Sequence, residues 1–526
     1  MNRSGLPQLL TGLAFLAITW GISLPLAHGQ DLLNDTIRFS GVTLQLRPYV
    51  VVPAETRNII SMTTRPGDDR LYVATQEGVI YAIGEDAGGR TTPTPWFDAR
   101  QAIESATGRR LDVGTRQSGL QAVAFHPDFT HYDLPGYGKF YTSFLEQRPA
   151  NAADAVYLGQ RFEDSTAASD SVLAEWTFDH GRGEVVAHSY RLVFRVWLPV
   201  YDHPIKQLQF NPYALPGDED YGLLYVAHGD ASPLSSPDDH PQSLKNALGK
   251  ILRIDPLVSG EEPYTIPATN PFAQSAEAEV LGEIYAYGFR NPHTFSFNAD
   301  DAGQVHLLAG DIGRNNIEEI NRVLPGGNYG WPKREGTFVY LQQPDDHPEA
   351  GYITGVAPLP ANDAAFGYIY PVAQFDHNAE IGQIRSGNAV ASGFVIRNGS
   401  DPRLHNQFIF ANFADHDGNV YHADFEAMLA AVIRSEATAV AHEVPAVLTQ
   451  ATIHRLRLSL DHDNNPSTPP ESYDDFLELL DESRSDIRFG QGVAGEMYIS
   501  SKRNGTIYLV TNSCRRFALP CRGEAE

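Results

Sequence analysis

The chain has 526 residues, 42% of them hydrophobic, and a formal net charge of -26 at neutral pH. This apolar content is sufficient for a large core, and the length allows either several average domains or one long all-β domain. The negative charge opposes binding to nucleic acid and to anionic membrane surfaces, because both are themselves negative. The composition therefore favours a soluble exported protein with neither of these partners.

The first 29 residues have the features of a secretory signal. Arg3 precedes an apolar run that reaches Ala27, and Ala27 and Gly29 form a small-x-small end. We expect residues 1–29 to be cleaved, which predicts a periplasmic or secreted protein. The alternative is a signal anchor that stays in the membrane.

Short strands recur along the rest of the chain. Residues 36–53 are alternating and β-branched, and residues 70–83 are predicted to be two strands joined by a turn at Glu77 and Gly78. Similar strand–turn–strand units occur at 224–255, 408–424 and 495–510. Their spacing predicts an all-β protein with radially arranged blades, in which the first strand pairs with the last strand pair and closes the sheet.

Three segments interrupt this pattern and are interpreted as insertions: 151–191, 344–365 and 425–485. Helical periodicity is confined to short pieces such as 473–484. We expect a single domain, residues 30–526, because a closed arrangement lets many strands coexist without exposed edges.

The stretch from Glu283 to Trp331 is dense in Gly, Asn, Pro and aromatic residues, a composition typical of loops that position functional groups. It contains EIYAYGFRNP, GDIGRNNIEEIN and GGNYGWP, and it follows GLQAVAFHPDF (119–129), LYVAHGD (224–230) and LGKILRIDP (248–256). In this order the motifs resemble the glucose/sorbosone dehydrogenase family. The resemblance implies a six-bladed β-propeller that uses pyrroloquinoline quinone (PQQ). We interpret GGNYGWP as scaffold, with Trp331 filling space between blades.

Oxidation of a sugar hydroxyl by hydride transfer to a quinone needs a base, a group that orients the base, and a cation beside the reactive carbonyl. The resemblance implies that His203, Asp230 and Arg290 fill these catalytic roles. Structural interpretations stay open, because Asp230 can cap a turn and Arg290 can brace a blade. The cofactor-binding residues implied by the resemblance are Gln117, Asp202, Arg290 and Asn291.

Calcium is the metal that the resemblance implies. The backbone carbonyls of Gly313 and Arg314 match the calcium-holding turn of the family, and such oxygen ligands suit a hard cation. A second acidic segment, LDHDNN at 460–465, lacks the glycine and the closing glutamate of a calcium loop. We interpret it as a solvated turn.

The sequence departs from the family pattern in two places. Pro204, Ile205 and Lys206 follow the proposed base where the family has small residues, which predicts a differently shaped substrate rim. Asp415 and Asp417 stand where the family has basic anchors for the PQQ carboxylates, so repulsion is expected to weaken cofactor binding. Arg385, Arg397 and Arg403 are the candidates for compensating positive charge.

These observations predict a secreted quinoprotein-type oxidoreductase that oxidises an aldose sugar or a related alcohol and passes electrons to an external acceptor. One alternative is a propeller without cofactor that acts as an extracellular binding or interaction module. Another is a calcium-dependent lactone hydrolase, because propellers host several chemistries. The lactone hydrolase requires a cluster of carboxylate and Asn ligands that converge on one site, and the sequence does not identify such a cluster.

Overall fold

The structure is a computed structural model that describes residues 33, 37–86, 88–151, 156–232, 238–341, 355–377, 389–413, 418–435, 447–463, 465 and 467–513. The expected signal segment, Arg385, Asp415 and Asp417 lie outside the described residues. In the part of the chain that is described, no helix is both long enough and apolar enough to cross a bilayer.

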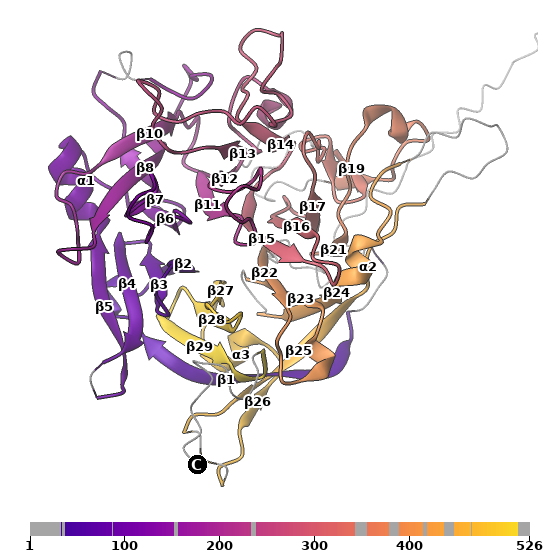
Figure 1. Cartoon of the computed structure of the whole chain (residues 1–526). Helices are drawn as coiled ribbons and strands as arrows, with labels where there is room; N and C mark the ends of the chain where they lie inside the picture. Colours follow the sequence, from indigo (N-terminus) through magenta and orange to yellow (C-terminus); the bar gives the residue numbers. More distant parts are fainter. Residues whose placement is uncertain are drawn as a thin grey trace, which may run out of the picture.

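Antiparallel sheets of successive strands dominate the molecule (Figure 1). The first sheet contains β2 (Ile59–Thr64), β3 (Leu71–Thr75), β4 (Val79–Glu85) and β5 (Thr91–Asp98). The second contains β6 (Leu120–Phe125), β7 (Lys139–Gln147), β8 (Ser169–Asp179) and β10 (Arg191–Val196), with β9 (Glu184–Val185) beside β8. The third contains β11 (Ile205–Phe210), β12 (Leu224–His228), β13 (Lys250–Ile254) and β14 (Ile284–Tyr287).

The remaining strands complete the circuit. The fourth sheet contains β15 (Pro292–Ala299), β16 (Val305–Asp311), β17 (Ile317–Val323) and β21 (Ala373–Asp376). A longer sheet follows in the order β22 (Val390–Ile396), β23 (Gln407–Asn412), β24 (Val420–Asp424), β25 (Ile453–Leu460), β1 (Phe39–Val51), β29 (Thr506–Val510), β28 (Met497–Ser501) and β27 (Ile487–Gln491), with β26 (Glu471–Tyr473) beside β25. A small sheet contains β18 (Arg334–Glu335), β19 (Phe338–Leu341) and β20 (Gly355–Ala357). The α-helices are α1 (Ala99–Thr107), α2 (Phe425–Leu429) and α3 (Phe476–Leu480).

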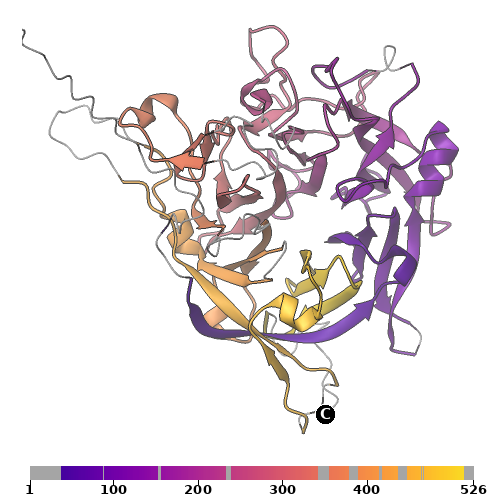
Figure 2. The same cartoon turned by 180° about the vertical axis from the view of Figure 1, so that it is seen from behind.

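The sheets surround a common centre. Their innermost strands contact one another in the order β2, β6, β11, β15, β22 and β27, and β27 returns to β2. Both views show this ring, with the outer strands directed away from it (Figures 1 and 2). The expected all-β class and radial arrangement are confirmed.

Apolar side chains fill the spaces between neighbouring sheets. Tyr72 of the first sheet shares a cluster with Phe125 of the second. Ile507 of the last sheet shares another with Ile59 of the first. Because strands such as β3 lie between two such clusters, they are buried on both faces, and their sequences are continuously apolar rather than alternating.

The turn predicted between the strands of residues 70–83 is confirmed. β3 pairs with β4, with Ala74 opposite Ile80. Gly78 lies in the turn with a φ of 101°, a backbone conformation that glycine adopts without steric penalty.

The first strand joins the two ends of the chain, as predicted. β1 pairs antiparallel with β29, with Pro48 opposite Tyr508. It also pairs in parallel with β25, a contact that the sequence did not predict, so that Leu46 lies opposite both Leu460 and Val510. β1 thereby merges the last two groups of strands into one sheet, and it runs along the side of the molecule between them (Figure 2).

Two segments interpreted as insertions carry strands of the scaffold. β8 lies within 151–191 and pairs along its length with β7 and with β10. β25 lies within 425–485 and pairs with β24 and β1. The insertion interpretation is corrected for these strands: β8 is buried on both faces and lacks the alternation used to recognise strands.

We expect Leu46→Ala to lower the free energy of unfolding by about 2 to 5 kcal/mol, because it leaves a cavity where β1 joins two groups of strands. Leu46 is 1% exposed. Val51→Ala, on the same strand but 58% exposed, is the matched control and should change stability by about 0.5 kcal/mol or less. Urea unfolding measures the stability of both variants. Equal effects would show that the packing of Leu46 on β1 does not contribute to stability as proposed.

Candidate active site

The centre of the site is a hydrogen bond between two side chains from neighbouring loops of the third sheet. His203 precedes β11, and Asp230 follows β12. His203 Nδ1 lies 2.6 Å from Asp230 Oδ1, and both side chains are almost fully buried. Because an ionised carboxylate only accepts hydrogen bonds, Nδ1 is the protonated nitrogen. Nε2 has no hydrogen-bond partner among the described residues and is therefore left to act as an acceptor.

Burial and neighbouring charges set the ionisation of this pair. Burial lowers the pKa of His203, Arg290 lowers it further, and together they outweigh the opposing effect of Asp230. Burial would raise the pKa of Asp230, but interactions with His203, Arg290 and Trp331 outweigh it and the pKa lies below its ordinary value. Near neutral pH, the pair is therefore a neutral imidazole held by an ionised carboxylate.

The backbone is shaped to bring the two loops together. His203 has a φ of 51°, a conformation that is uncommon outside glycine and that often marks functional sites. A Cβ on Gly229 would lie 2.4 Å from His203 Cβ, so only glycine permits this close approach. The glycine of the AHGD motif thus has a steric explanation.

Trp331 is a site residue that the sequence interpretation missed. Its Nε1 donates a hydrogen bond to Asp230 Oδ2 at 2.8 Å. Its ring lies 5.8 Å from the guanidinium carbon of Arg290. The interpretation of Trp331 as a space-filling residue alone is corrected, because its indole N–H orients the carboxylate that holds His203. The density of aromatic and glycine residues around it was the available signal.

Gln117 and Asp202 lie together beside the histidine. Gln117 Nε2 donates to Asp202 Oδ1 at 3.1 Å. Gln117 Oε1 accepts from the backbone N–H of His203 at 3.4 Å. The structure therefore brings these two predicted residues to the loop that carries the base, although they come from different sheets.

Arg290 and Asn291 lie across from this loop and precede β15. The backbone carbonyl of Arg290 accepts the N–H of Asp230 at 2.7 Å, which links the two parts of the site. Asp311, which the sequence interpretation did not single out, accepts the backbone N–H groups of Arg290 and Asn291 at 3.0 and 2.6 Å. The side-chain carbonyl oxygen of Asn291 is buried without a hydrogen-bond partner among the described residues.

The predicted calcium turn is built around a glutamate. Glu335 Oε1 accepts the backbone N–H groups of Arg314 and three following residues, at 2.7 to 3.3 Å. The carbonyl of Gly313 accepts a hydrogen bond from Arg290 Nη1 at 2.7 Å. A carbonyl oxygen has two lone pairs, so this contact leaves one for a cation. Within the described ranges, no three His, Cys, Asp or Glu residues are grouped to hold a metal.

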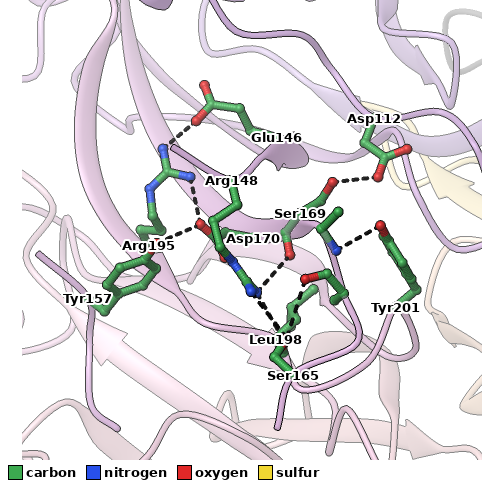
Figure 3. Close-up of polar contacts among 12 residues, drawn as sticks. Asp112, Glu146, Arg148, Tyr157, Ser165, Ser169, Asp170, Arg195, Leu198 and Tyr201 are labelled. Atoms are coloured by element: carbon green, nitrogen blue, oxygen red, sulfur yellow. Dashed lines mark hydrogen bonds and ion pairs between the residues drawn. The ribbon is translucent and has the colours of Figure 1, made fainter. Parts of the chain in front are cut away.

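An ion-pair network at one end of the second sheet holds the segment that precedes His203 (Figure 3). Arg148 binds Asp170 at 2.8 Å and donates to the carbonyl of Leu198 at 3.1 Å. Ser165 Oγ donates to the same carbonyl at 2.6 Å. The network therefore ties the chain segment before His203 to the second sheet.

The two residues Ile205 and Lys206, which follow His203, have different surroundings. Ile205 is fully buried in an apolar cluster, whereas Lys206 Nζ donates to Gln121 Oε1 at 3.2 Å on the inner strand β6. Two further cations, Arg488 on β27 and Lys502 after β28, are also buried. The sequence interpretation named Lys206 only as part of the bulky segment after the base, and it did not single out Arg488 and Lys502, because nothing in their local sequence shows that they are buried.

The compensating arginines that the sequence suggested have other partners. Arg397 forms an ion pair with Asp301 at 2.7 Å. Arg403 is exposed and paired with Asp401 at 2.7 Å. Both form ion pairs with aspartates, so the structure does not support either as the compensating charge that the sequence suggested.

The fold and the site define a β-propeller protein with a buried histidine–aspartate pair near its centre. A family model described as Glucose / Sorbosone dehydrogenase matches residues 62–352, which is more than half of the chain. The chain belongs to the glucose/sorbosone dehydrogenase family.

Relatives of this chain include proteins from plants and bacteria. It is 26% identical over 435 residues to the HIPL1 protein of Arabidopsis thaliana, covering 73% of this chain and 57% of that protein. It is 27% identical over 275 residues to quinoprotein glucose dehydrogenase B of Acinetobacter calcoaceticus, covering 51% of this chain and 49% of that protein. The chain thus spans about half the length of these curated relatives.

A solved structure shares the fold. The soluble aldose sugar dehydrogenase of Escherichia coli, determined in the apo-form, superposes with a TM-score of 0.50 at 16% identity. The match covers 88% of this chain and 97% of that chain. At this identity the likeness concerns the fold alone.

The buried ammonium of Lys502 makes stability depend on pH. Burial, with Arg488 acting in the same direction, lowers the pKa of Lys502 to about 7, below that of an unfolded lysine. Between these values the unfolded chain binds the additional proton, so this residue makes stability rise with pH from 7 upward. Lys502→Met should reduce the gain in unfolding free energy between pH 7 and pH 9 by up to about 2 kcal/mol.

Denaturant unfolding at several pH values measures this difference. Lys245→Met, at a surface ion pair with Glu279, is the control and should retain the wild-type pH dependence. A Lys502→Met protein with the same dependence as wild type would contradict the burial of a charge at this position.

Proposed function

We propose that this protein is a secreted quinoprotein-type oxidoreductase that oxidises the hydroxyl of an aldose sugar or a related alcohol with PQQ as cofactor. The observation that carries the proposal is the buried hydrogen bond of 2.6 Å between His203 and Asp230. We further propose that the sheets form the six blades of one propeller domain, residues 30–526, with the site at its centre. Membership of the family and the fold shared with a sugar dehydrogenase support this function.

His203 is the proposed base. Its Nδ1–H is donated to Asp230, so Nε2 is free to take the proton of the substrate hydroxyl. As the imidazole becomes positive, the ionised Asp230 stabilises it, and Trp331 keeps the carboxylate oriented. Bound PQQ supplies the hydride acceptor.

Arg290 is the proposed cation beside the reactive carbonyl. Its Nη1 is anchored by the carbonyl oxygens of Ile312 and Gly313 at 2.9 and 2.7 Å, so its position is fixed before ligand binding. The unpartnered side-chain oxygen of Asn291 is a polar atom that a ligand can satisfy. With Gln117 and Asp202 on the opposite side, these groups are the proposed cofactor-binding residues.

We propose that calcium binds the backbone carbonyls of Gly313 and Arg314. The second lone pair of the Gly313 oxygen and the polar chemistry of the turn fit a hard cation. Cofactor oxygen atoms and water would complete the ligand set. An external electron acceptor and a sugar or alcohol substrate are the proposed partners, and the proposed location is the periplasm or the exterior of the cell.

A second candidate function is that of an extracellular binding module without cofactor. The observation that favours it is Lys206, whose side chain follows the proposed base and is buried near the centre. The two candidates differ in whether the protein binds PQQ, so one titration separates them.

The test is to add PQQ and calcium to the purified protein and to record bound-quinone absorbance and sugar-dependent dye reduction. We expect both signals. In His203→Gln, turnover should fall by about two to four orders of magnitude while PQQ affinity is nearly unchanged, because the base is lost and the cofactor contacts remain. Asp230→Asn should lose less.

The matched control is His131→Gln, which removes an exposed histidine and should keep wild-type turnover. Wild-type turnover in His203→Gln would refute the assignment of the base. A wild-type protein without bound quinone would favour the binding module.

A further inference from the structure

Two histidine side chains face each other on adjacent strands of the long sheet, outside the proposed active site. His422 lies on β24 and His454 on β25, and the two residues are directly opposite in the antiparallel register. Side chains opposite each other in such a pair project from the same face of the sheet. Their ring centres are 5.5 Å apart, and their planes are inclined by 36°. β24 and β25 lie between β23 and β1 in this sheet (Figure 1).

A chain of hydrogen bonds fixes the tautomer of His422. Gln407 Nε2 donates to Asp424 Oδ2 at 3.4 Å, so the amide nitrogen of Gln407 points to the carboxylate and the amide oxygen points the other way. That oxygen lies 2.7 Å from His422 Nδ1. Because an amide oxygen only accepts hydrogen bonds, Nδ1 carries the proton and Nε2 has a free lone pair.

The free nitrogen of His422 is buried. The residue is 5% exposed, and its Nε2 has no hydrogen-bond partner among the described residues. A buried acceptor without a partner costs free energy that a ligand can recover. His454 is half-buried and forms no side-chain hydrogen bond within the described part of the chain. It therefore offers a second free imidazole and a path from solvent.

The charges around the pair favour a cation. Among the described residues, the charged groups that act on His422 are His454 and the carboxylate of Asp424. Arg455, next to His454 in the chain, pairs with Asp475 at 3.6 Å instead. Burial lowers the pKa of His422 to about 4, with His454 adding to this effect and Asp424 opposing it. The imidazole is therefore neutral at pH 7, and no proton competes for Nε2.

The spacing of the two rings fits one tetrahedral metal ion. Zinc binds imidazole nitrogen at about 2.0 to 2.1 Å, which places the centres of two rings on one ion about 5 to 5.5 Å apart. Gln407 is the outer group that orients a metal-binding histidine through its other nitrogen. No third His, Cys, Asp or Glu joins the pair in the described ranges, so water would complete the ligand set.

We propose that His422 and His454 bind a zinc ion that joins β24 to β25. This site is independent of the proposed function. Because β25 also pairs with β1, an ion that binds only the folded chain stabilises the sheet in which the two ends of the chain meet.

The test is isothermal titration of the full chain with zinc, in excess calcium so that sites built from oxygen ligands are occupied. We expect a saturable site for one zinc ion per chain and a higher unfolding temperature when zinc is added. His422→Gln and His454→Gln should each lose this binding. Gln407→Leu should raise the dissociation constant about ten- to a hundredfold, because the hydrogen bond that orients His422 is lost. Magnesium, which prefers oxygen ligands, should not bind here.

Control variants exclude other imidazoles. His203→Gln removes the buried histidine of the proposed active site, His131→Gln removes an exposed histidine, and both should bind zinc as wild type does. A wild-type chain that binds no zinc, or unchanged zinc affinity in both His422→Gln and His454→Gln, would overturn the proposal. Zinc binding that is lost only in His203→Gln would also overturn it. If His422→Gln does not fold, His454→Gln, at the half-buried position, decides by the same criteria.

Discussion

The hydrogen bond between His203 and Asp230 is the interaction on which the rest of the site depends. It fixes the tautomer of the imidazole, and the carboxylate can do so only while Trp331 and the backbone N–H of Ser232 satisfy its remaining lone pairs. The carbonyl of Arg290 in turn accepts the N–H of Asp230. Segments from neighbouring sheets therefore meet at one carboxylate, so the chemistry requires that the third and fourth sheets stay packed together.

The scaffold that meets this requirement was largely predictable from sequence. The turn at Gly78 and the pairing of the first strand with the last followed from alternation and glycine placement, which are local signals. The pairing of His203 with Asp230 was expected from the resemblance to the family, and the close approach at Gly229 explains how their two loops meet. β8 was not recognised, because a strand buried on both faces has no period of two.

Contacts across the centre could not be predicted, because they depend on which sheets face one another. Lys206 and Lys502 are almost three hundred residues apart, yet consecutive carbonyls bind them. Trp331 lies in a glycine-rich loop whose sequence shows only a turn. Conversely, Arg397 and Arg403 lie close in sequence to the region that needed charge but pair with surface aspartates. The spacing of strands along the chain predicts the blades. Which side chains contact one another depends on how the blades are arranged in the ring, which the sequence alone does not show.

The most direct measurement of the central claim is the nitrogen NMR titration of histidine side chains in the full chain, with His203 assigned through His203→Gln. At pH 7 the account predicts a neutral His203 with the proton on Nδ1 and a bare Nε2, and protonation only below the ordinary histidine pKa of about 6.5. A His203 that is doubly protonated at pH 7, or that carries its proton on Nε2, would contradict it.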